Sequence, residues 1–208
     1  MNTLFKIALR AFGLMGVAAI VWWLAPSEVA PQAQQSAPLL AQAQMVNIID
    51  FEEQTEESRW RNVDDTVMGG VSQSAFSITP NGYGLFSGTL SLENNGGFTS
   101  VRRSVDDAGL TGAQAIVLRV KGDGRVYQFR LRMNESNRDI SYRSEFETSG
   151  EWQTVRLPIE SFEPVFRGRI VAGAPTLEPG NVRQLGFLLA SKESGSFTLE
   201  IESIQSEL

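Results

Sequence analysis

The sequence predicts an all-β protein, with a jelly-roll β-sandwich over residues 45–208 that follows an N-terminal apolar helix and a flexible tether. Segments of alternating apolar and polar residues recur about every ten to fifteen residues past residue 45, which is typical of strands in a sandwich. Turn-forming Gly, Asn and Asp residues stand between these segments. Past residue 45 no stretch keeps apolar residues at helical spacing for three turns, so we do not expect helices to build the domain.

Residues 11–25 form an unbroken apolar run, and Lys6 and Arg10 precede it. A positive flank before an apolar core is typical of a signal peptide, which we expect over residues 1–25. As a helix the run spans about 22 Å, and an extension back to Leu4 spans about 33 Å, against about 30 Å for the hydrocarbon layer of a bilayer. The segment is therefore either a cleaved signal peptide or an uncleaved membrane anchor.

The positive charges beside the apolar run predict its orientation. No Lys or Arg occurs between Arg10 and Arg59, so both early positive charges lie on the N-terminal side of the run. Because positively charged flanks tend to stay in the cytoplasm, we expect the domain on the non-cytoplasmic side of the membrane, in a periplasm or a lumen.

Residues 26–44 differ in composition from the rest of the chain. Thirteen of these nineteen residues are Pro, Gln or Ala, and Glu28 is the only charged one. A segment of this composition does not bury a core, so we expect a flexible linker between the apolar run and the domain.

Two strand-like segments, residues 115–121 and 125–133, flank the turn Gly122-Asp123-Gly124. A short Gly-rich connection between β-rich segments is typical of a β-hairpin, and we expect these two strands to pair. From Tyr127 to the end of the second segment every second residue is apolar, whereas the residues between them are polar. This alternation predicts one face toward the core and a polar, arginine-bearing face away from it. The other clear segments of this kind are residues 83–92, 98–103 and 197–202.

The chain contains neither Cys nor His. The absence of Cys excludes disulfides, thiolate nucleophiles and zinc ribbons, and the absence of His excludes imidazole catalysis and the Ser-His-Asp triad. No acidic, Lys or Tyr residues are spaced as a recognisable catalytic constellation. The net charge of −6 and the pI near 4.8 argue against nucleic-acid binding, which depends on neutralising phosphates. We therefore expect a protein that is not an enzyme, without catalytic residues and without a cofactor.

Acidic residues occur in adjacent pairs, at Glu52-Glu53, Asp64-Asp65 and Asp106-Asp107. Neighbouring residues of a strand point to opposite faces, so this spacing predicts neither a shared-proton dyad nor a metal site. A bound calcium ion is the less favoured alternative, because the first and last strands of jelly rolls often lie side by side and both ends of this domain carry carboxylates. These carboxylates are Asp50 and Glu52 near the start, with Glu200 or Glu202 near the end.

Basic residues concentrate between Arg102 and Arg143, where nine of them stand against five acidic residues. Almost all are Arg, whose planar guanidinium suits carboxylate and phosphate partners. One interpretation is a sheet face that pairs internally with Glu145 and Glu147, and the other is a face that binds an anionic ligand or an acidic protein. Charged residues within loop motifs are a further place where binding sites form. Together these arguments make the candidate binding residues Asp64, Asp65, Arg102, Arg103, Arg130 and Arg132.

Four segments carry a resemblance to a known family: WRNVDDTVMGGVSQSAF from Trp60, GTLSLENNGGFTSVRR from Gly88, KGDGRVYQFRLR from Lys121 and EWQTVRLPIESF from Glu151. The chain resembles the complex I intermediate-associated protein family, the thirty-kilodalton assembly factor, over residues 46–206. The resemblance implies a galactose-binding-like jelly roll and a role in the assembly of a membrane complex, respiratory or photosynthetic. It brings no catalytic residues. The N-terminus departs from the family pattern, because an apolar run replaces the amphipathic, Arg-rich presequence of a mitochondrial protein.

The residues and the resemblance together predict a binding module that acts as an assembly factor or scaffold for a membrane protein complex. Its expected partners are protein subunits of that complex, and membrane contact is expected through the N-terminal segment. The alternative is a carbohydrate-binding module of an exported protein, which needs aromatic platforms on an exposed sheet face to bind a glycan. Tyr127 and Tyr142 share their strand faces with Phe129 and Phe146, so we expect both tyrosines in the core.

Overall fold

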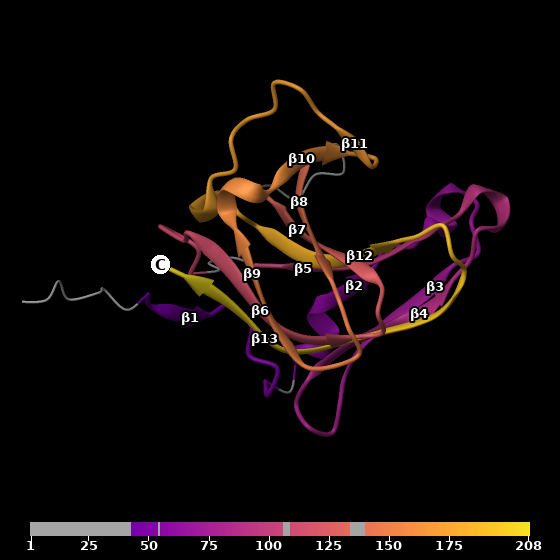
Figure 1. Cartoon of the computed structure of the whole chain (residues 1–208), viewed down its shortest axis with the longest axis horizontal. Coiled ribbons are helices and arrows are strands. Elements are labelled where there is room, and N and C mark those ends of the chain that lie inside the picture. Colours follow the sequence, from indigo (N-terminus) through magenta and orange to yellow (C-terminus); the bar gives the residue numbers. More distant parts are fainter. Residues whose placement is uncertain (1–42, 54, 106–108, 134–139) are drawn as a thin grey trace, which may run out of the picture. The chain divides into compact units, whose positions relative to one another are not determined.

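The computed structural model of the protein describes residues 43–53, 55–105, 109–133 and 140–208 (Figure 1). These residues form two antiparallel β-sheets packed face to face, with short 3₁₀ turns in the connections, which confirms the predicted all-β jelly roll. Within these ranges no helix combines the length and the apolar character needed to cross a bilayer. The expected signal peptide or anchor (residues 1–25), the tether before residue 43 and the acidic pair Asp106-Asp107 lie outside the described residues.

Among the described residues, one sheet has six strands and the other has seven. The six-stranded sheet has the order β3 (Gln73–Ile78), β4 (Gly84–Leu90), β13 (Gly195–Glu207), β6 (Ala115–Gly122) and β9 (Gln153–Pro158), and β1 (Met45–Asn47) also pairs with β13. The seven-stranded sheet has the order β11 (Arg169–Ile170), β10 (Glu163–Phe166), β8 (Ser141–Glu147), β7 (Val126–Arg132), β12 (Gln184–Ala190), β5 (Phe98–Ser104) and β2 (Trp60–Asn62).

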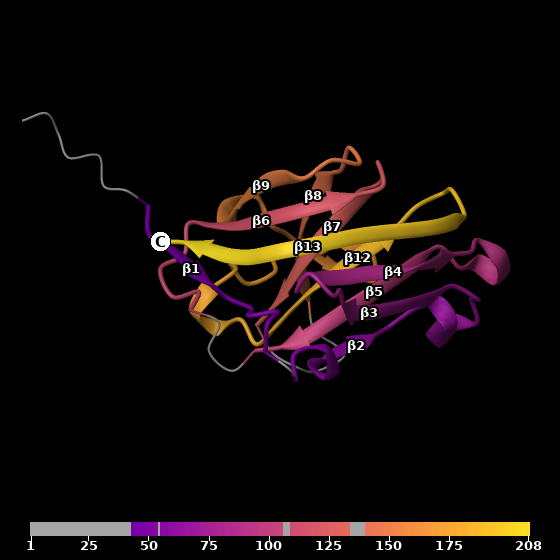
Figure 2. The same ribbon diagram turned by 90° about the horizontal axis from the view of Figure 1, so that it is seen from below.

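The first and last strands lie side by side, as the jelly-roll prediction requires (Figure 2). Met45 of β1 stands opposite Glu207 of β13. The long strand β13 runs between β4 and β6, so the C-terminal segment of the chain joins the early strands of its sheet to the later ones.

The expected hairpin between residues 115–121 and 125–133 is wrong. Both segments are strands, but β6 pairs with β13 and β9, whereas β7 pairs with β12 and β8. The Gly122-Asp123-Gly124 turn therefore carries the chain from one sheet to the other, and the Tyr127 hydroxyl donates a hydrogen bond to the Asp123 carboxylate at 3.0 Å beside it. Each strand is apolar on one side only, and in separate sheets these two sides face each other across the core.

The core between the sheets is rich in aromatic side chains. Tyr127, Phe129 and Leu131 are fully buried, as the alternation in the sequence predicts. Trp60 of β2 stacks on Phe76 of β3 with ring centroids 4.1 Å apart, which ties an edge of one sheet to an edge of the other. Because every second side chain fills the core, the residues between them cover the outer face of the seven-stranded sheet.

Candidate functional site

Four arginines and one glycine stand next to one another across the outer face of the seven-stranded sheet. Arg61 of β2 stands opposite Arg102 of β5, and Gly186 of β12 stands opposite Arg102 on one side and Arg130 of β7 on the other. Arg130 in turn stands opposite Arg143 of β8. Paired residues of an antiparallel sheet point to the same face, and strands lie about 4.8 Å apart, so the four arginines extend over about 19 Å. We call Arg61, Arg102, Arg130 and Arg143 the arginine row.

Gly186 lies at the centre of the arginine row, and only glycine fits there. A Cβ atom at this position would collide with the carbonyl oxygen of Val101 on the neighbouring strand. The missing side chain leaves a hollow of about 10 Å³, the space of one water molecule, which Arg102, Arg130 and Arg132 line together with Gly186. The strand register thus opens a small, positively charged depression between two arginines.

Burial and like charges lower the pKa of two arginines in the row. The pKa of Arg102 falls to about 10, first because of burial and then because of the charges of Arg132 and Arg61. The pKa of Arg130 also falls to about 10, first because of burial and then because of the neighbouring arginines, Arg132 foremost. The protonated guanidiniums therefore repel one another in a partly dehydrated place, and a bound anion would relieve that repulsion.

The two ends of the arginine row differ in their partners. At the β8 end, Arg143 pairs with Glu163 at 3.1 Å and with Glu145 at 3.6 Å. At the β2 end, no hydrogen-bond acceptor or acidic side chain among residues 43–53, 55–105, 109–133 and 140–208 contacts the Arg61 or Arg102 guanidinium. The β8 end thus pairs internally, through Glu145 as expected and through Glu163 in place of Glu147. Binding of an anion at the β2 end stays a prediction.

Arg130 lies between these two ends and has neutral partners. Its Nε and Nη2 atoms donate to the Gln128 side-chain oxygen at 3.0 and 2.6 Å, and its Nη1 atom donates to the Ser141 hydroxyl at 3.1 Å. These contacts orient the guanidinium without neutralising its charge. Arg130 is therefore held in place as a preorganised cation.

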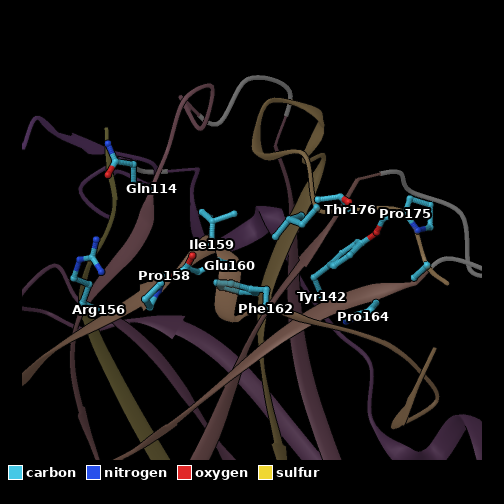
Figure 3. Close-up of a pocket in the computed structure, with 12 residues that line it drawn as sticks. Gln114, Tyr142, Arg156, Pro158, Ile159, Glu160, Phe162, Pro164, Pro175 and Thr176 are labelled. Atoms are coloured by element: carbon cyan, nitrogen blue, oxygen red, sulfur yellow. The ribbon is translucent and has the colours of Figure 1, made fainter. Parts of the chain in front are cut away.

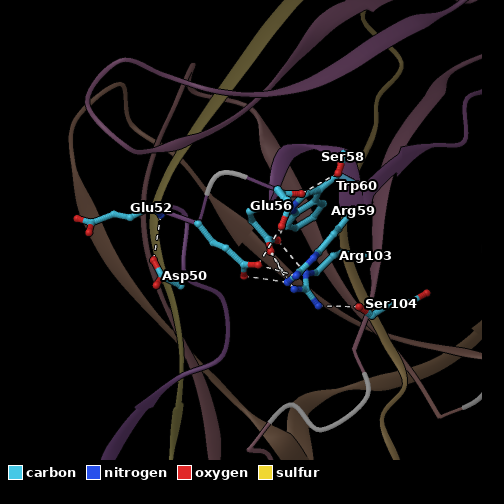
Figure 4. Close-up of polar contacts among 10 residues, drawn as sticks. Asp50, Glu52, Glu56, Ser58, Arg59, Trp60, Arg103 and Ser104 are labelled. Carbon is cyan, nitrogen blue, oxygen red and sulfur yellow. Dashed lines mark hydrogen bonds and ion pairs between the residues drawn. The ribbon is translucent and has the colours of Figure 1, made fainter.

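Arg103, although adjacent to Arg102, lies on the other side of β5 in a buried ion pair (Figure 4). Its Nε and Nη2 atoms donate to the two carboxylate oxygens of Glu56 at 2.7 and 2.8 Å, and the Trp60 indole donates to Glu56 at 2.9 Å. Arg59 contacts the same carboxylate from the exposed side at 3.5 Å. This network fastens the segment before β2 to β5, and it keeps Arg103 out of the arginine row.

Asp65 joins two loops, residues 64–72 and 91–98, and Asp64 fastens the first of them to β3. The buried Asp65 carboxylate accepts hydrogen bonds from the Ser72 amide at 2.9 Å, the Ser72 hydroxyl at 2.5 Å and the Gly97 amide at 2.7 Å. Asp64 accepts hydrogen bonds from the amide and hydroxyl of Ser74 at 2.9 and 2.6 Å. The structure thus brings Arg102, Arg130 and Arg132 together, and it places both aspartates outside the hollow that these arginines line.

Sequence reasoning missed Arg61 and Gly186 as members of the site. Arg61 follows Trp60, whose burial turns the next side chain outward, and this alternation was the available signal. Nothing local marks Gly186, because its place between Arg102 and Arg130 depends on pairing with two strands that are distant in the sequence.

A larger pocket of about 660 Å³ lies at one end of the sandwich (Figure 3). Tyr142, Phe162 and Pro158 contribute apolar surface, and the Tyr142 hydroxyl donates to the carbonyl oxygen of Pro175 at 2.7 Å. The lining Arg156 already pairs with Glu207 at 2.6 Å. This pocket therefore lacks the unpaired positive charge that distinguishes the arginine row.

The acidic residues considered as calcium ligands each have a different partner. Glu200 and Glu202 pair with Lys121 and Arg119 at 3.8 and 3.3 Å, and Asp50 accepts a hydrogen bond from the amide of Glu52. In the part of the chain that the structure describes, no three acidic side chains are grouped so as to hold a metal ion.

Comparisons with known proteins agree with this fold. The profile of a family described as complex I intermediate-associated protein 30 (CIA30) matches residues 49–201. An uncharacterised protein of Schizosaccharomyces pombe is 30% identical over 174 residues, which cover 74% of this chain and 80% of the yeast protein. The mitochondrial complex I intermediate-associated protein 30 of Mus musculus is 25% identical over 175 residues, which cover 74% of this chain and 53% of the mouse protein. The chain thus spans about half the length of the mouse protein.

Solved structures with a similar fold come from carbohydrate-active proteins. The family 11 carbohydrate-binding module from Clostridium thermocellum, in complex with a β-1,3-1,4-mixed-linked tetrasaccharide, matches with a TM-score of 0.62 and 18% identity, over 80% of this chain and 97% of the module. An agarase matches with a TM-score of 0.53 and 10% identity, over 80% of this chain and 25% of the agarase. At these identities the likeness shows the shared fold alone.

Proposed function

Because the chain belongs to the complex I intermediate-associated protein 30 family, we propose that it is a non-enzymatic binding module that serves as an assembly factor or scaffold for a membrane protein complex, respiratory or photosynthetic. The observation that carries the proposal is the arginine row, at whose β2 end Arg61 and Arg102 have no hydrogen-bond or ion-pair partner in the part of the chain that the structure describes. A face of this kind suits an acidic surface of a protein subunit.

The arginine row favours a partner with several carboxylates. Each planar guanidinium can donate two parallel hydrogen bonds to one carboxylate. The guanidiniums are spaced by the sheet over about 19 Å, so an extended acidic segment of a partner contacts more than one of them at a time. Complementary charge of this type raises the association rate and fixes orientation more than it raises affinity.

The proposal places the domain beside the membrane on its non-cytoplasmic side. The apolar run at residues 11–25 and the tether at residues 26–44 would keep or deliver the domain there. Tethering confines the domain to the neighbourhood of membrane subunits and raises its effective concentration for them.

Affinity purification of the tagged full-length chain from solubilised membranes, followed by mass spectrometry, tests the proposal. We expect subunits of one partly assembled membrane complex to co-purify. The double variant Arg61→Glu/Arg102→Glu is expected to lower their recovery at least tenfold, because two open cations become anions. Neither guanidinium has a hydrogen bond or an ion pair within the described residues to lose, so the domain is expected to remain folded.

The matched control reverses two charges on the other sheet. Arg119→Glu/Lys121→Glu changes the net charge by the same amount on β6, where the side chains pair with Glu202 and Glu200. We expect this variant to recover the same subunits as the original chain. Equal recovery with the Arg61/Arg102 variant would show that the arginine row is not the contact surface, and recovery of no membrane-complex subunit would remove the assembly role.

Carbohydrate binding is the second candidate function, and one observation favours it. Trp152 and Tyr83 form an edge-to-face pair with centroids 5.1 Å apart, and the Arg119 guanidinium lies 6.0 Å from the Trp152 ring. Both rings are only half-buried, whereas Tyr127 and Tyr142 are buried as expected. A glycan array with micromolar ligands that Trp152→Ala abolishes would favour this function, and an array without ligands would leave the assembly role.

A further inference from the structure

Four large apolar side chains are exposed on two adjoining loops. Val67 and Met68 are 69% and 62% exposed, and Val71 and Leu92 are 44% and 42% exposed. They belong to residues 64–72 and 91–98, the loops that Asp65 joins. Both views place these loops, drawn in purple and magenta, at the end of the sandwich opposite the C-terminus (Figures 1 and 2). We call Val67, Met68, Val71 and Leu92 the apolar tip.

The loops bury polar residues and expose apolar ones. Asp65 and Ser72 are fully buried, while the apolar residues between and beside them face solvent. The Ser72 hydroxyl donates its proton to Asp65 and accepts a hydrogen bond from the Ser91 amide at 2.9 Å, which places Val71 and Leu92 on neighbouring segments. This inverted arrangement leaves most of the surface of Val67 and Met68 in solvent, so these two side chains contribute little to the core.

Internal hydrogen bonds hold the apolar tip in shape before any partner arrives. The Asp65 carboxylate connects the two loops, and the 3₁₀ turn at Asp65–Met68 ends at Gly69, whose φ of 92° favours glycine. A Cβ atom at Gly70 would collide with the Asp65 carboxylate. A preorganised surface loses little conformational entropy on binding, which favours a specific contact.

The charge of the surrounding segment indicates a protein partner rather than a lipid surface. No Lys or Arg occurs in residues 62–101, and Glu93 stands next to Leu92. The Ser191 amide donates to the carbonyl oxygen of Gly97 at 3.3 Å, and Lys192 and Glu193 after it add one charge of each sign. Segments that bind a membrane interface combine apolar residues with Lys or Arg, which interact with anionic lipids. An exposed apolar cluster with a polar and acidic rim is instead typical of a protein–protein contact.

We propose that the apolar tip is a docking surface that inserts Val67 and Met68 into an apolar pocket, with a neutral or basic rim, on a protein subunit. The inference rests on the proposed function in that this subunit is the one that binds the arginine row. From Arg102 back to Gly97, in the loop that carries Leu92, the extended chain covers about 17 Å. A protein interface of ordinary size buries about 800 Å² on each side and is about 30 Å across, so one subunit spans both surfaces.

Site-specific photo-crosslinking in intact membranes tests the docking surface. A photoreactive residue replaces Met68 in the full-length chain, and the matched control carries it at Ile170 of β11, which is 63% exposed and lies on the other edge of the domain. We expect a crosslink from position 68 to the subunit that co-purifies with the unmodified chain, and none from position 170. The variant Val67→Ser/Met68→Ser is expected to lower recovery of that subunit about tenfold, the effect of losing one binding hot spot, whereas Ile170→Ser leaves it unchanged.

Three results would overturn the docking surface: a crosslink from position 68 to a second copy of this chain, binding of phosphatidylcholine–phosphatidylglycerol vesicles that Val67→Ser/Met68→Ser abolishes, or unchanged recovery of the subunit with that variant. Circular dichroism and thermal unfolding of both serine variants verify that the fold is kept.

The outcomes separate this inference from the assembly role. A crosslink at position 68 to a protein outside any membrane complex retains the docking surface and removes the assembly role. Co-purified membrane subunits without a crosslink from position 68 retain the assembly role and remove the docking surface. If no subunit co-purifies and no crosslink forms, both proposals are removed.

Discussion

Arg102 and Arg130 stand in one register row on the outer face of the seven-stranded sheet, separated only by Gly186. Because Gly186 has no side chain, nothing from the strand between them screens one guanidinium from the other. The register therefore holds two like charges in a partly dehydrated place. The pKa of each falls to about 10, first because of burial and then because of nearby arginines, Arg132 foremost. The fold maintains this repulsion in the free protein, and an anion that binds between the two arginines removes it.

Replacing Arg102 with Gln is expected to raise the free energy of unfolding by about 0.5 kcal/mol, because the change removes a like charge from the row. Arg143→Gln is the matched control on the same face, and it is expected to lower this free energy or leave it unchanged, because Arg143 pairs with Glu163. Urea unfolding at low ionic strength measures both effects. Added salt should reduce the rise in the free energy of unfolding that Arg102→Gln produces. If Arg102→Gln lowered the free energy of unfolding more than Arg143→Gln does, this would contradict the repulsion between the arginines.

Asp65→Asn is expected to lower the free energy of unfolding by about 2–3 kcal/mol. The amide keeps one acceptor oxygen and sets an NH₂ group against donors of Ser72 and Gly97, so buried hydrogen bonds are lost. The exposed Asp50→Asn is the control and should change the free energy by less than about 0.5 kcal/mol. Equal effects of the two substitutions in chemical unfolding would show that Asp65 does not hold the loops together.

The same carboxylate predicts a dependence of stability on acid. Burial by itself raises the pKa of Asp65, but hydrogen bonds from Ser72, Gly97 and Phe98 bring the pKa below the ordinary value of 3.8. A carboxyl group with a lowered pKa in the folded state stabilises the fold above that ordinary value, and this contribution disappears as the pH falls through the lower, folded-state pKa. Between neutral pH and pH of about 3, unfolding free energies of the original chain and of Asp65→Asn should therefore converge. A constant difference between them would contradict this.

Arg103→Met is expected to lower the free energy of unfolding by about 3–5 kcal/mol, because it leaves the Glu56 carboxylate buried without its cation. The double variant Glu56→Gln/Arg103→Met should lose less than the sum of the two single variants, since it leaves no unpaired charge. Arg59→Met removes only the exposed partner of Glu56 and should cost about 1 kcal/mol or less. Additive single effects in a double-mutant cycle would show that Glu56 and Arg103 act independently.

The orientation predicted from Lys6, Arg10 and the apolar run is testable with a reporter fused after Leu208. An enzyme that is active only outside the cytoplasm should be active in this fusion, because the positive flank stays on the cytoplasmic side. The control replaces Lys6 and Arg10 with Glu, which weakens the orienting charge. Activity of a cytoplasm-only reporter at the same position would contradict the topology, and the mass of the fusion on an immunoblot distinguishes an anchor from a cleaved signal peptide.

Much of the fold can be predicted from the chain alone, because strand periodicity is a local property. The alternation after Tyr127 identifies both the strand and its buried face, and the absence of Cys and His excludes whole classes of chemistry. Strand pairing cannot be predicted from this local pattern. The chain turns at Gly122-Asp123-Gly124 as expected, yet β6 and β7 enter different sheets, since their partners are chosen by contacts far away in the sequence.

The candidate site is likewise only partly predictable from the sequence. The cluster of arginines from Arg102 onward is visible in the sequence, but Arg102 and Arg103 are chemically identical neighbours until β5 is placed in its sheet. One then points outward into the arginine row, and the other points toward Glu56 and is neutralised there. Arg61 and Gly186 join the row only because β2 and β12 pair with β5 in a particular register. A strand determines locally which residues share a face, whereas the sheet determines which strands stand side by side. The arginine row, built across five strands, exists only at that second level.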